Sequence, residues 1–150
     1  MSEYGAACRT NWFRVTDPER LRRIIARAET LQGNPIMLWK SKDKQQRDVY
    51  AFGCYGTIDV YEYDTDDDDD YEYSSFIADL SEILPDDEAI VISEIENEKL
   101  QYLVAYTIVV TKYEIRTVDL FNTSVQEAEE MLCDTKYATD FYGCGEVVAL

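Results

Sequence analysis

The segment of residues 101–111, QYLVAYTIVVT, constrains the fold more than any other part of the chain. It is rich in β-branched and aromatic residues and is apolar on both faces of an extended chain, which is typical of a central strand. The segment 88–95 precedes it across a turn around Asn97, and the segment 115–120 follows across a second short turn. These three segments predict an antiparallel sheet built from hairpins.

Three helices are expected from stripes of apolar residues, over 16–31, 74–84 and 124–132. The first and third begin with pairs at capping-box spacing, Thr16 with Glu19 and Ser124 with Glu127. The residues expected to be buried are Leu21, Ile24, Ile25 and Ala28 in the first helix, Phe76, Ile77, Leu80 and Leu84 in the second, and Val125, Ala128, Met131 and Leu132 in the third.

The remaining strands are expected at 10–15, 36–41, 48–56 and 57–63, with a last short strand at 146–150. Residues 1–8 and much of 134–150 are expected to be loose. No linker or repeat divides the chain, so residues 1–150 are predicted to form a single α+β domain. Its sheet is expected to be mainly antiparallel, with five to seven strands and with two or three helices on one face.

The charge of the chain is strongly negative and unevenly distributed. The formal net charge is −17, yet residues 1–50 hold ten Lys and Arg against six Asp and Glu. Residues 59–98 contain seventeen carboxylates, and no basic residue occurs between Arg47 and Lys99. This charge disfavours direct binding of nucleic acid, whose phosphates require basic residues, and favours a basic protein partner. The alternative is that the charge serves only solubility or halophilic character.

The four arginines of the first helix, Arg20, Arg22, Arg23 and Arg27, lie near the start of that helix, where they oppose its dipole. The simplest expectation is that they pack against part of the acidic half, although contact with a partner is the open alternative.

The four cysteines show no Cys-x-x-Cys spacing, and the chain has no histidine, which disfavours a structural zinc site. Cys54 alternates with apolar neighbours and is expected in the core. Cys133 and Cys144 could form a bridge, although free thiols fit a reducing compartment better. The absence of a signal-peptide pattern and of a long apolar run favours a cytoplasmic location.

Calcium is the first chemistry to consider for Asp64, Asp66, Asp68 and Asp70. A calcium loop of the EF-hand type that begins at Asp64 requires glycine and glutamate where this chain has Asp69 and Ser75. No metal or other cofactor is therefore expected. The chain also lacks a histidine base, an activated nucleophile and a glycine-rich phosphate loop, so no enzymatic activity is expected. A small enzyme or metal-binding protein remains a third hypothesis.

The acidic run DTDDDDD lies between two copies of Tyr-Glu-Tyr, at residues 61–73. Arginine both stacks on tyrosine and forms paired hydrogen bonds with carboxylates, so this composition predicts a surface that binds an Arg-rich protein. The residues expected to bind the partner are Tyr61, Glu62, Tyr63, Asp64, Asp66, Asp67, Asp68, Asp69, Asp70, Tyr71, Glu72 and Tyr73, extended by Asp86, Asp87, Glu88, Glu94, Glu96 and Glu98. The competing interpretation is a solvated loop without function.

Two acidic segments, TIDVYEYDTDDDDDYEY and PDDEAIVISEIENEKL, give the chain a character similar to that of known inhibitors. It resembles the acidic anti-CRISPR and anti-restriction proteins of phages and mobile elements, several of which mimic nucleic acid electrostatically. The segments TNWFRVTDPERLRRII and ENEKLQYLVAYTIVV also resemble small proteins of bacterial mobile elements. The resemblance is one of overall character and carries no residue roles.

The resemblance implies an inhibitor that acts as a DNA mimic in the cytoplasm of a bacterial host. Its expected partner is the basic nucleic-acid-binding surface of a defence nuclease. The alternative function is a regulatory module that binds a basic host protein without mimicking nucleic acid.

Overall fold

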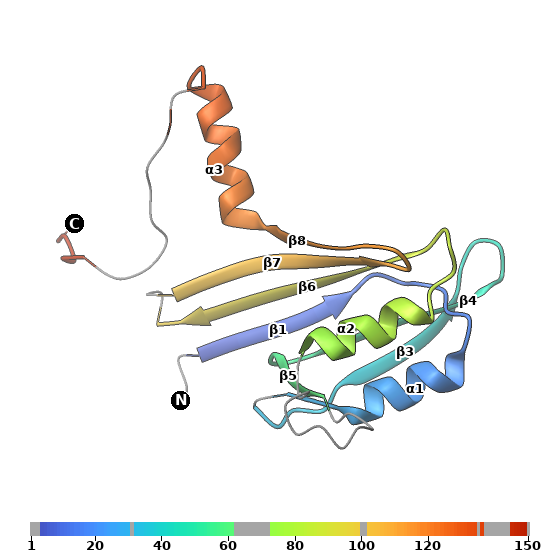
Figure 1. The fold of residues 1–150 in the computed structure, drawn as a ribbon. Helices are drawn as coiled ribbons and strands as arrows, with labels where there is room; N and C mark the ends of the chain where they lie inside the picture. The colour runs from blue at the N-terminus through green and yellow to red at the C-terminus, as the bar shows by residue number, and fades with distance from the viewer. Residues whose placement is uncertain are drawn as a thin grey trace.

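The computed structural model describes residues 4–30, 32–61, 73–99, 102–134, 136 and 145–149. These residues form one α+β domain (Figure 1). The strands are β1 (Tyr4–Thr10), β2 (Ala28–Thr30), β3 (Met37–Lys42), β4 (Asp48–Cys54), β5 (Ile58–Tyr61), β6 (Ala89–Glu98), β7 (Tyr102–Thr111) and β8 (Ile115–Asp119). The helices are α1 (Pro18–Arg27), α2 (Tyr73–Glu82) and α3 (Leu120–Met131).

Six of the described strands form an antiparallel sheet in the order β3-β4-β1-β6-β7-β8, and β2 pairs with β5 in a second, two-stranded sheet. The predicted α+β class, the antiparallel sheet and the hairpins on either side of β7 are thereby confirmed. The expectation of a loose segment at 1–8 is wrong for residues 4–8, because β1 lies in the middle of the sheet between β4 and β6, whereas residues 1–3 lie outside the described residues. The predicted strand at 10–15 is also wrong: beyond Thr10 only Phe13 pairs with the sheet, through an isolated bridge to Tyr50.

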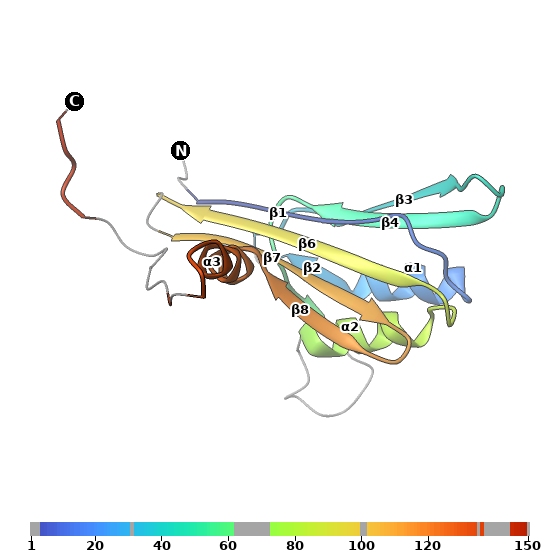
Figure 2. The same cartoon turned by 90° about the horizontal axis from the view of Figure 1, so that it is seen from above.

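The register of the strands defines two faces of the six-stranded sheet. Cys8, Phe52, Ile92 and Ile108 belong to one face, here called the inner face. Side chains at the alternate positions of each strand point to the opposite face, here called the outer face. They include Arg9 on β1 and the residues paired with it across the neighbouring strands. Helices α1 and α2 cover the inner face (Figures 1 and 2), whereas no helix among the described residues lies across the outer face.

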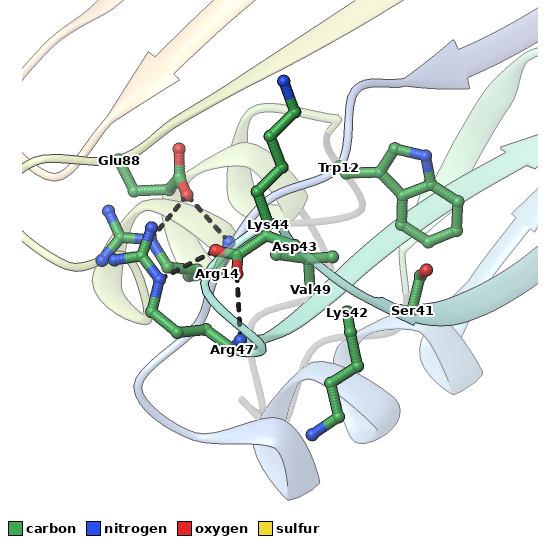
Figure 3. A pocket seen from close by; sticks show the side chains of 9 residues that line it. All are labelled: Trp12, Arg14, Ser41, Lys42, Asp43, Lys44, Arg47, Val49 and Glu88. Carbon is green, nitrogen blue, oxygen red and sulfur yellow. Dashed lines mark hydrogen bonds and ion pairs between the residues drawn. The ribbon is translucent and has the colours of Figure 1, made fainter.

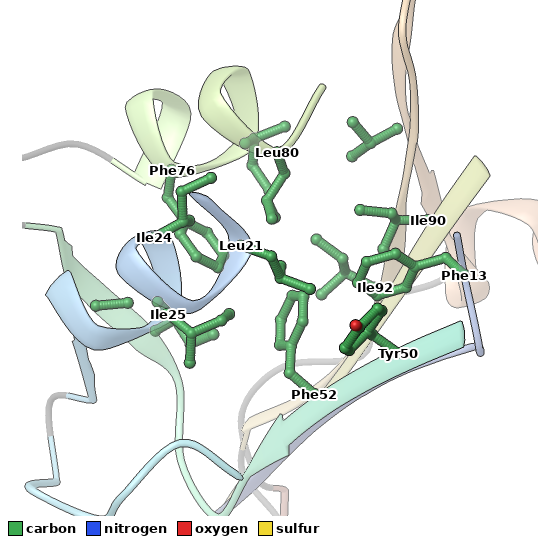
Figure 4. Packing of buried hydrophobic residues seen from close by; sticks show 14 of the residues in the cluster. Phe13, Leu21, Ile24, Ile25, Tyr50, Phe52, Phe76, Leu80, Ile90 and Ile92 are labelled. Carbon is green, nitrogen blue, oxygen red and sulfur yellow. The ribbon is translucent and has the colours of Figure 1, made fainter. Parts of the chain in front are cut away.

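The hydrophobic core fills the space between the inner face and helices α1 and α2 (Figure 4). Phe52 lies at its centre, with its ring 6.1 Å from that of Phe13 and 5.7 Å from that of Phe76 in edge-to-face geometry. The stripes predicted for the first two helices are confirmed, because all of their residues are buried. Fully burying a large apolar side chain contributes about 1.5–3 kcal/mol, so this cluster is the main source of stability.

The caps of α1 and α3 differ from the predicted capping boxes. Asp17, not Thr16, caps α1, and its side chain accepts a hydrogen bond from the backbone N–H of Arg20. The hydroxyl of Thr16 donates instead to the carbonyl of Ile83, so a tertiary contact uses the side chain that the capping box requires. Helix α3 begins at Leu120 behind the cap Asp119, four residues before the predicted start.

Helix α3 buries none of its residues within the described structure, which contradicts the burial expected for Val125, Ala128, Met131 and Leu132. Met131 is 83% exposed, and Val125 and Ala128 are only half-buried. Figure 1 shows the reason: α3 projects from the end of β8, away from the layer that α1 and α2 form. Residues 145–149 form no strand, so the strand predicted at 146–150 is wrong over that range.

Candidate interaction site

The acidic run lies between the end of β5 and the start of α2. Residues 62–72, which include most of the predicted binding residues, lie outside the described residues. Tyr61 is the last residue of β5 and Tyr73 is the first of α2. Both flanking elements are held in the fold, because β5 pairs with β2 and α2 contributes Phe76 and Leu80 to the core.

The second predicted acidic segment, Asp86 to Glu88, is engaged in ion pairs. Arg14 contacts Asp87 at 2.9 Å and Glu88 at 3.1 Å, and its backbone N–H also donates to Glu88. Lys112 contacts Asp86 at 3.0 Å. Hydrogen bonds from Lys112 and Arg14, respectively, lower the pKa values of Asp86 and Asp87. Although no basic residue occurs between Arg47 and Lys99, these carboxylates are paired, because Arg14 and Lys112 reach them from outside that part of the chain.

Carboxylates of α2 pair with α1. The guanidinium of Arg20 lies 3.7 Å from Asp79 and forms a closer ion pair with Glu82. The packing of the α1 arginines against the acidic half is thus confirmed for Arg20, whereas Arg22 pairs with Glu19 inside α1.

The predicted binding residues on β6 point to the inner face, and their exposure increases toward the end of the strand. Glu94 is only 4% exposed and accepts a hydrogen bond from the phenol of Tyr106. Glu96 is half-buried, and Glu98 is exposed. Glu94 therefore lies in the interior of the described structure, and only the end of β6 presents a carboxylate fully to solvent.

The buried Glu94 perturbs its neighbours. The pKa of the Cys8 thiol lies far above its ordinary value, first because of a hydrogen bond with Cys54 and then because of burial and the negative charge of Glu94. The pKa of Tyr106 is raised by burial and by its hydrogen bond to Glu94. The Cys8 thiol and the Tyr106 phenol are thus held in their neutral, protonated forms, which makes them poor nucleophiles at neutral pH.

A pocket of about 480 Å³, which was not predicted from the sequence, lies beside the β3–β4 turn (Figure 3). Figure 3 shows Trp12 on one side and the guanidinium groups of Arg14 and Arg47 on the other. Lys42 and Lys44 also line it. The signal for such a pocket was present in the sequence as the alternating basic residues of 40–47.

Both arginines of this pocket are paired with carboxylates that also line it. Arg47 contacts Asp43 at 2.8 Å, and Arg14 contacts Glu88 at 3.1 Å, so two carboxylates occupy donors that a bound anion would need. The Asp43 carboxylate also accepts hydrogen bonds from the backbone N–H groups of Gln45 and Arg47, which fixes the turn. The arrangement stabilises the β3–β4 hairpin.

The described residues contain no group of three or more Asp, Glu, Cys or His side chains placed to hold a metal ion. The calcium hypothesis for Asp64, Asp66, Asp68 and Asp70 concerns residues outside the described ranges. In the part of the chain that the structure describes, none of the helices has the length and apolar character needed to cross a membrane.

Comparison with known proteins gives no relative from which a function could be transferred. No protein family matches the chain, and no curated protein and no solved structure shows significant similarity to it.

Proposed function

We propose that the chain is a non-enzymatic inhibitor that binds the basic, nucleic-acid-binding surface of a bacterial defence nuclease. The acidic run at 62–72 is its principal contact, and Tyr61 and Tyr73 adjoin it at the ends of β5 and α2. The carboxylates take the place of the phosphates that the nuclease binds.

The observation that supports this proposal most is that many Lys and Arg side chains form ion pairs with carboxylates outside the acidic run. Eight of its fourteen Lys and Arg side chains form ion pairs with carboxylates outside the run. Arg9 is stacked on Trp39, with its guanidinium carbon 4.4 Å from the ring centroid. The eight carboxylates of 62–72 therefore outnumber the cations that remain to neutralise them. The run alone carries a charge of −8, nearly half of the net charge of −17.

The spacing of this charge also suits a phosphate-binding surface. Successive residues of an extended chain rise by about 3.3 Å. Phosphates along one strand of B-DNA recur about every 3.4 Å of helix axis, which is nearly the same linear charge density. A row of aspartates can thus meet the arginines and lysines of a nucleic-acid channel at a matching interval, and arginine can also stack on the neighbouring tyrosines.

The revised footprint is smaller than the predicted one. Asp86, Asp87 and Glu88 stabilise the fold through ion pairs, and Glu94 is buried. The proposal therefore rests on residues 61–73, and the exposed Glu98 and the half-buried Glu96 remain as candidates toward the end of β6.

The experiment measures binding to a guide-loaded CRISPR nuclease and to a restriction endonuclease between about 50 and 200 mM salt. The test variant changes Asp66 through Asp70 to Asn. A matched control removes the same charge from five exposed carboxylates elsewhere, namely Glu29, Glu127, Glu130, Asp134 and Glu146. We expect the test variant to lose at least about tenfold in affinity and to show a shallower salt dependence, whereas the control keeps most of the affinity.

Competition with DNA separates this function from that of a regulatory module. An inhibitor of the proposed kind and duplex DNA exclude one another on the nuclease. Affinity that responds neither to salt nor to the aspartate variant, or simultaneous binding of DNA, contradicts the proposal.

A further inference from the structure

The outer face of the six-stranded sheet lacks carboxylates, although the chain contains 31 Asp and Glu residues. At the outer-face positions of the six strands the only charged residues are Arg9 and Arg116. On β6 the alternation is plain, because Glu94 and Glu96 point to the inner face and Ile95 points to the outer one. Glu114, at the rim, is paired with Arg116.

The centre of this face is an exposed apolar groove. One hollow of about 270 Å³ is lined by Ile95, Ala105, Val118 and Leu120, and its surface is almost entirely apolar. A second hollow of about 230 Å³ lies on the other side of Ile95 and reaches Leu103. Ile95 is 55% exposed, Val118 44% and Leu103 39%. Contiguous exposed apolar side chains of this kind mark interaction surfaces.

Helix α3 extends the groove. Its first turn lines the larger hollow through Leu120 and Thr123. Further along, Phe121, Val125 and Ala128 lie at the spacing of one helix face, yet none of them is buried. A helix of 12 residues is only marginally stable in water without packing against another surface. Among the described residues, Val125 and Ala128 are therefore only partly covered.

We propose that a second copy of this chain packs against the outer face, so that two copies form a symmetric dimer through face-to-face sheets. The distribution of charge is the reason for proposing a second copy as the partner of this face. Two copies with a net charge of −17 repel one another at most orientations. Pairing through the outer faces keeps the carboxylates of both copies away from the contact.

The area of the face is sufficient for such a dimer. With strands about 4.8 Å apart and about 3.3 Å per residue, six strands of this length present roughly 600 Å² before side-chain relief is counted. Stable interfaces bury about 800 Å² per partner, and α3 adds further apolar surface. Two packed sheets lie about 10 Å apart and align within about 30°. Helices α1 and α2 then face outward on both copies, and with them the start of α2 at Tyr73 (Figure 2).

The dimer is independent of the proposed inhibition and responds to salt in the opposite direction. Salt screens the repulsion between the two acidic copies, so their association strengthens as salt rises. Binding of the acidic run to a basic nuclease weakens under the same change. Failure of one proposal is therefore distinguishable from failure of the other.

The test is sedimentation velocity of the full chain at up to about 100 μM, in about 0.05 M and 0.5 M salt. We expect a species of twice the 17.4 kDa monomer mass that becomes more populated at the higher salt. Val118→Glu and Ile95→Glu place a carboxylate on the outer face and are expected to weaken association at least about tenfold. Thr117→Glu is the matched control, because Thr117 is an exposed neighbour on the same strand that points to the opposite face.

Thermal unfolding of each variant verifies that it remains folded, and the exposure of Val118 and Ile95 makes both substitutions tolerable. A chain that stays monomeric at the highest concentration and salt overturns the proposal. A dimer that responds equally to Thr117→Glu and Val118→Glu also overturns it. If the chain does not self-associate but binds an unrelated protein, and Ile95→Glu abolishes that binding, the outer face is the site for that protein. This result also contradicts the dimer.

Discussion

Tyr106 donates a hydrogen bond from its phenol to the carboxylate of Glu94, which lies directly opposite it in the β6–β7 pair and is only 4% exposed. A buried carboxylate is costly unless donors satisfy it. Tyr106 thus makes it possible for an acidic residue to lie beside the hydrophobic core.

Tyr106→Phe removes the donor while keeping the ring. The free energy of unfolding is expected to fall by about 1–3 kcal/mol, because the Glu94 carboxylate loses a hydrogen bond in the interior. Tyr113→Phe is the control: Tyr113 also donates to a carboxylate, that of Asp86, but is 74% exposed. Its loss is expected to cost less than about 0.5 kcal/mol. Urea unfolding at neutral pH measures the free energy of unfolding of both variants. Equal losses in the two variants would contradict the role assigned to Glu94.

Alkaline pH is expected to destabilise the protein. The folded state raises the pKa of Cys8 above its ordinary 9.0 and that of Tyr106 above its ordinary 10.0. A raised pKa stabilises the fold fully below the ordinary value, and this contribution is lost as the pH rises above it. Stability should therefore be flat near neutral pH and decline above about pH 9, by up to about 1.4 kcal/mol per pH unit for each proton involved. In Tyr106→Phe the decline above about pH 10 should be shallower.

Acidic pH is also expected to destabilise the protein, because the aspartates that form ion pairs become protonated. The pKa values of Asp43, Asp48, Asp86 and Asp87 lie below the ordinary 3.8. A lowered pKa contributes stability above the ordinary value, and this is lost as the pH falls through the folded value. Arg14→Gln removes the partner of Asp87, so the difference in melting temperature from the wild type should shrink below about pH 4. For Arg23→Gln, on the exposed side of α1, the difference should not depend on pH in this way.

The cysteines are expected to differ in reactivity. Cys8 and Cys54 are buried, whereas Cys133 is exposed just after α3, and all three have free thiols. In the folded protein Cys133 should react with iodoacetamide at least about tenfold faster than the two buried thiols. Peptide mapping by mass spectrometry separates the sites, and urea should remove the difference. Fast modification of Cys54 without unfolding would contradict the burial described.

Gly56 is expected to resist substitution. Its backbone has a φ of +134°, and a Cβ there would collide with the side chain of Gln32, which accepts a hydrogen bond from the N–H of Thr57 at 3.1 Å. Gly56→Ala should therefore lower stability by about 1–3 kcal/mol. Gly5→Ala is the comparison, since no atom lies within 4 Å of a Cβ at that position, and it should be nearly neutral. Thermal unfolding distinguishes the two.

The parts of the fold that could be predicted from the sequence are those whose signals are local. The stripe of α2 and the β-branched run of β7 each specify an element without reference to the rest of the chain. The segment of β1, YGAACRT, contains small residues and little alternation. It becomes a strand because β6 and β4 offer edges on both sides, which no local pattern reveals.

The candidate site was predictable only in part, for the same reason. The concentration of charge is a property of the sequence, but the partners of Asp86, Asp87 and Glu88 come from residues distant in the chain. Which carboxylates stabilise the fold and which remain for a partner is thus decided by tertiary contacts. The burial of Glu94 follows from the register of β1 and β6, which places it opposite Cys8.

The central position of β1 has a consequence for the order of folding. The β3–β4 hairpin and the β6-β7-β8 meander can each form from neighbouring segments, and only β1 joins them by backbone hydrogen bonds. Contacts between distant segments form slowly because a long loop must close first. During synthesis β1 must therefore wait, unpaired on its β6 side, until residues 89–98 have left the ribosome. A chaperone that shields this short strand, or an extension that obstructs it, would control when the two halves become one domain.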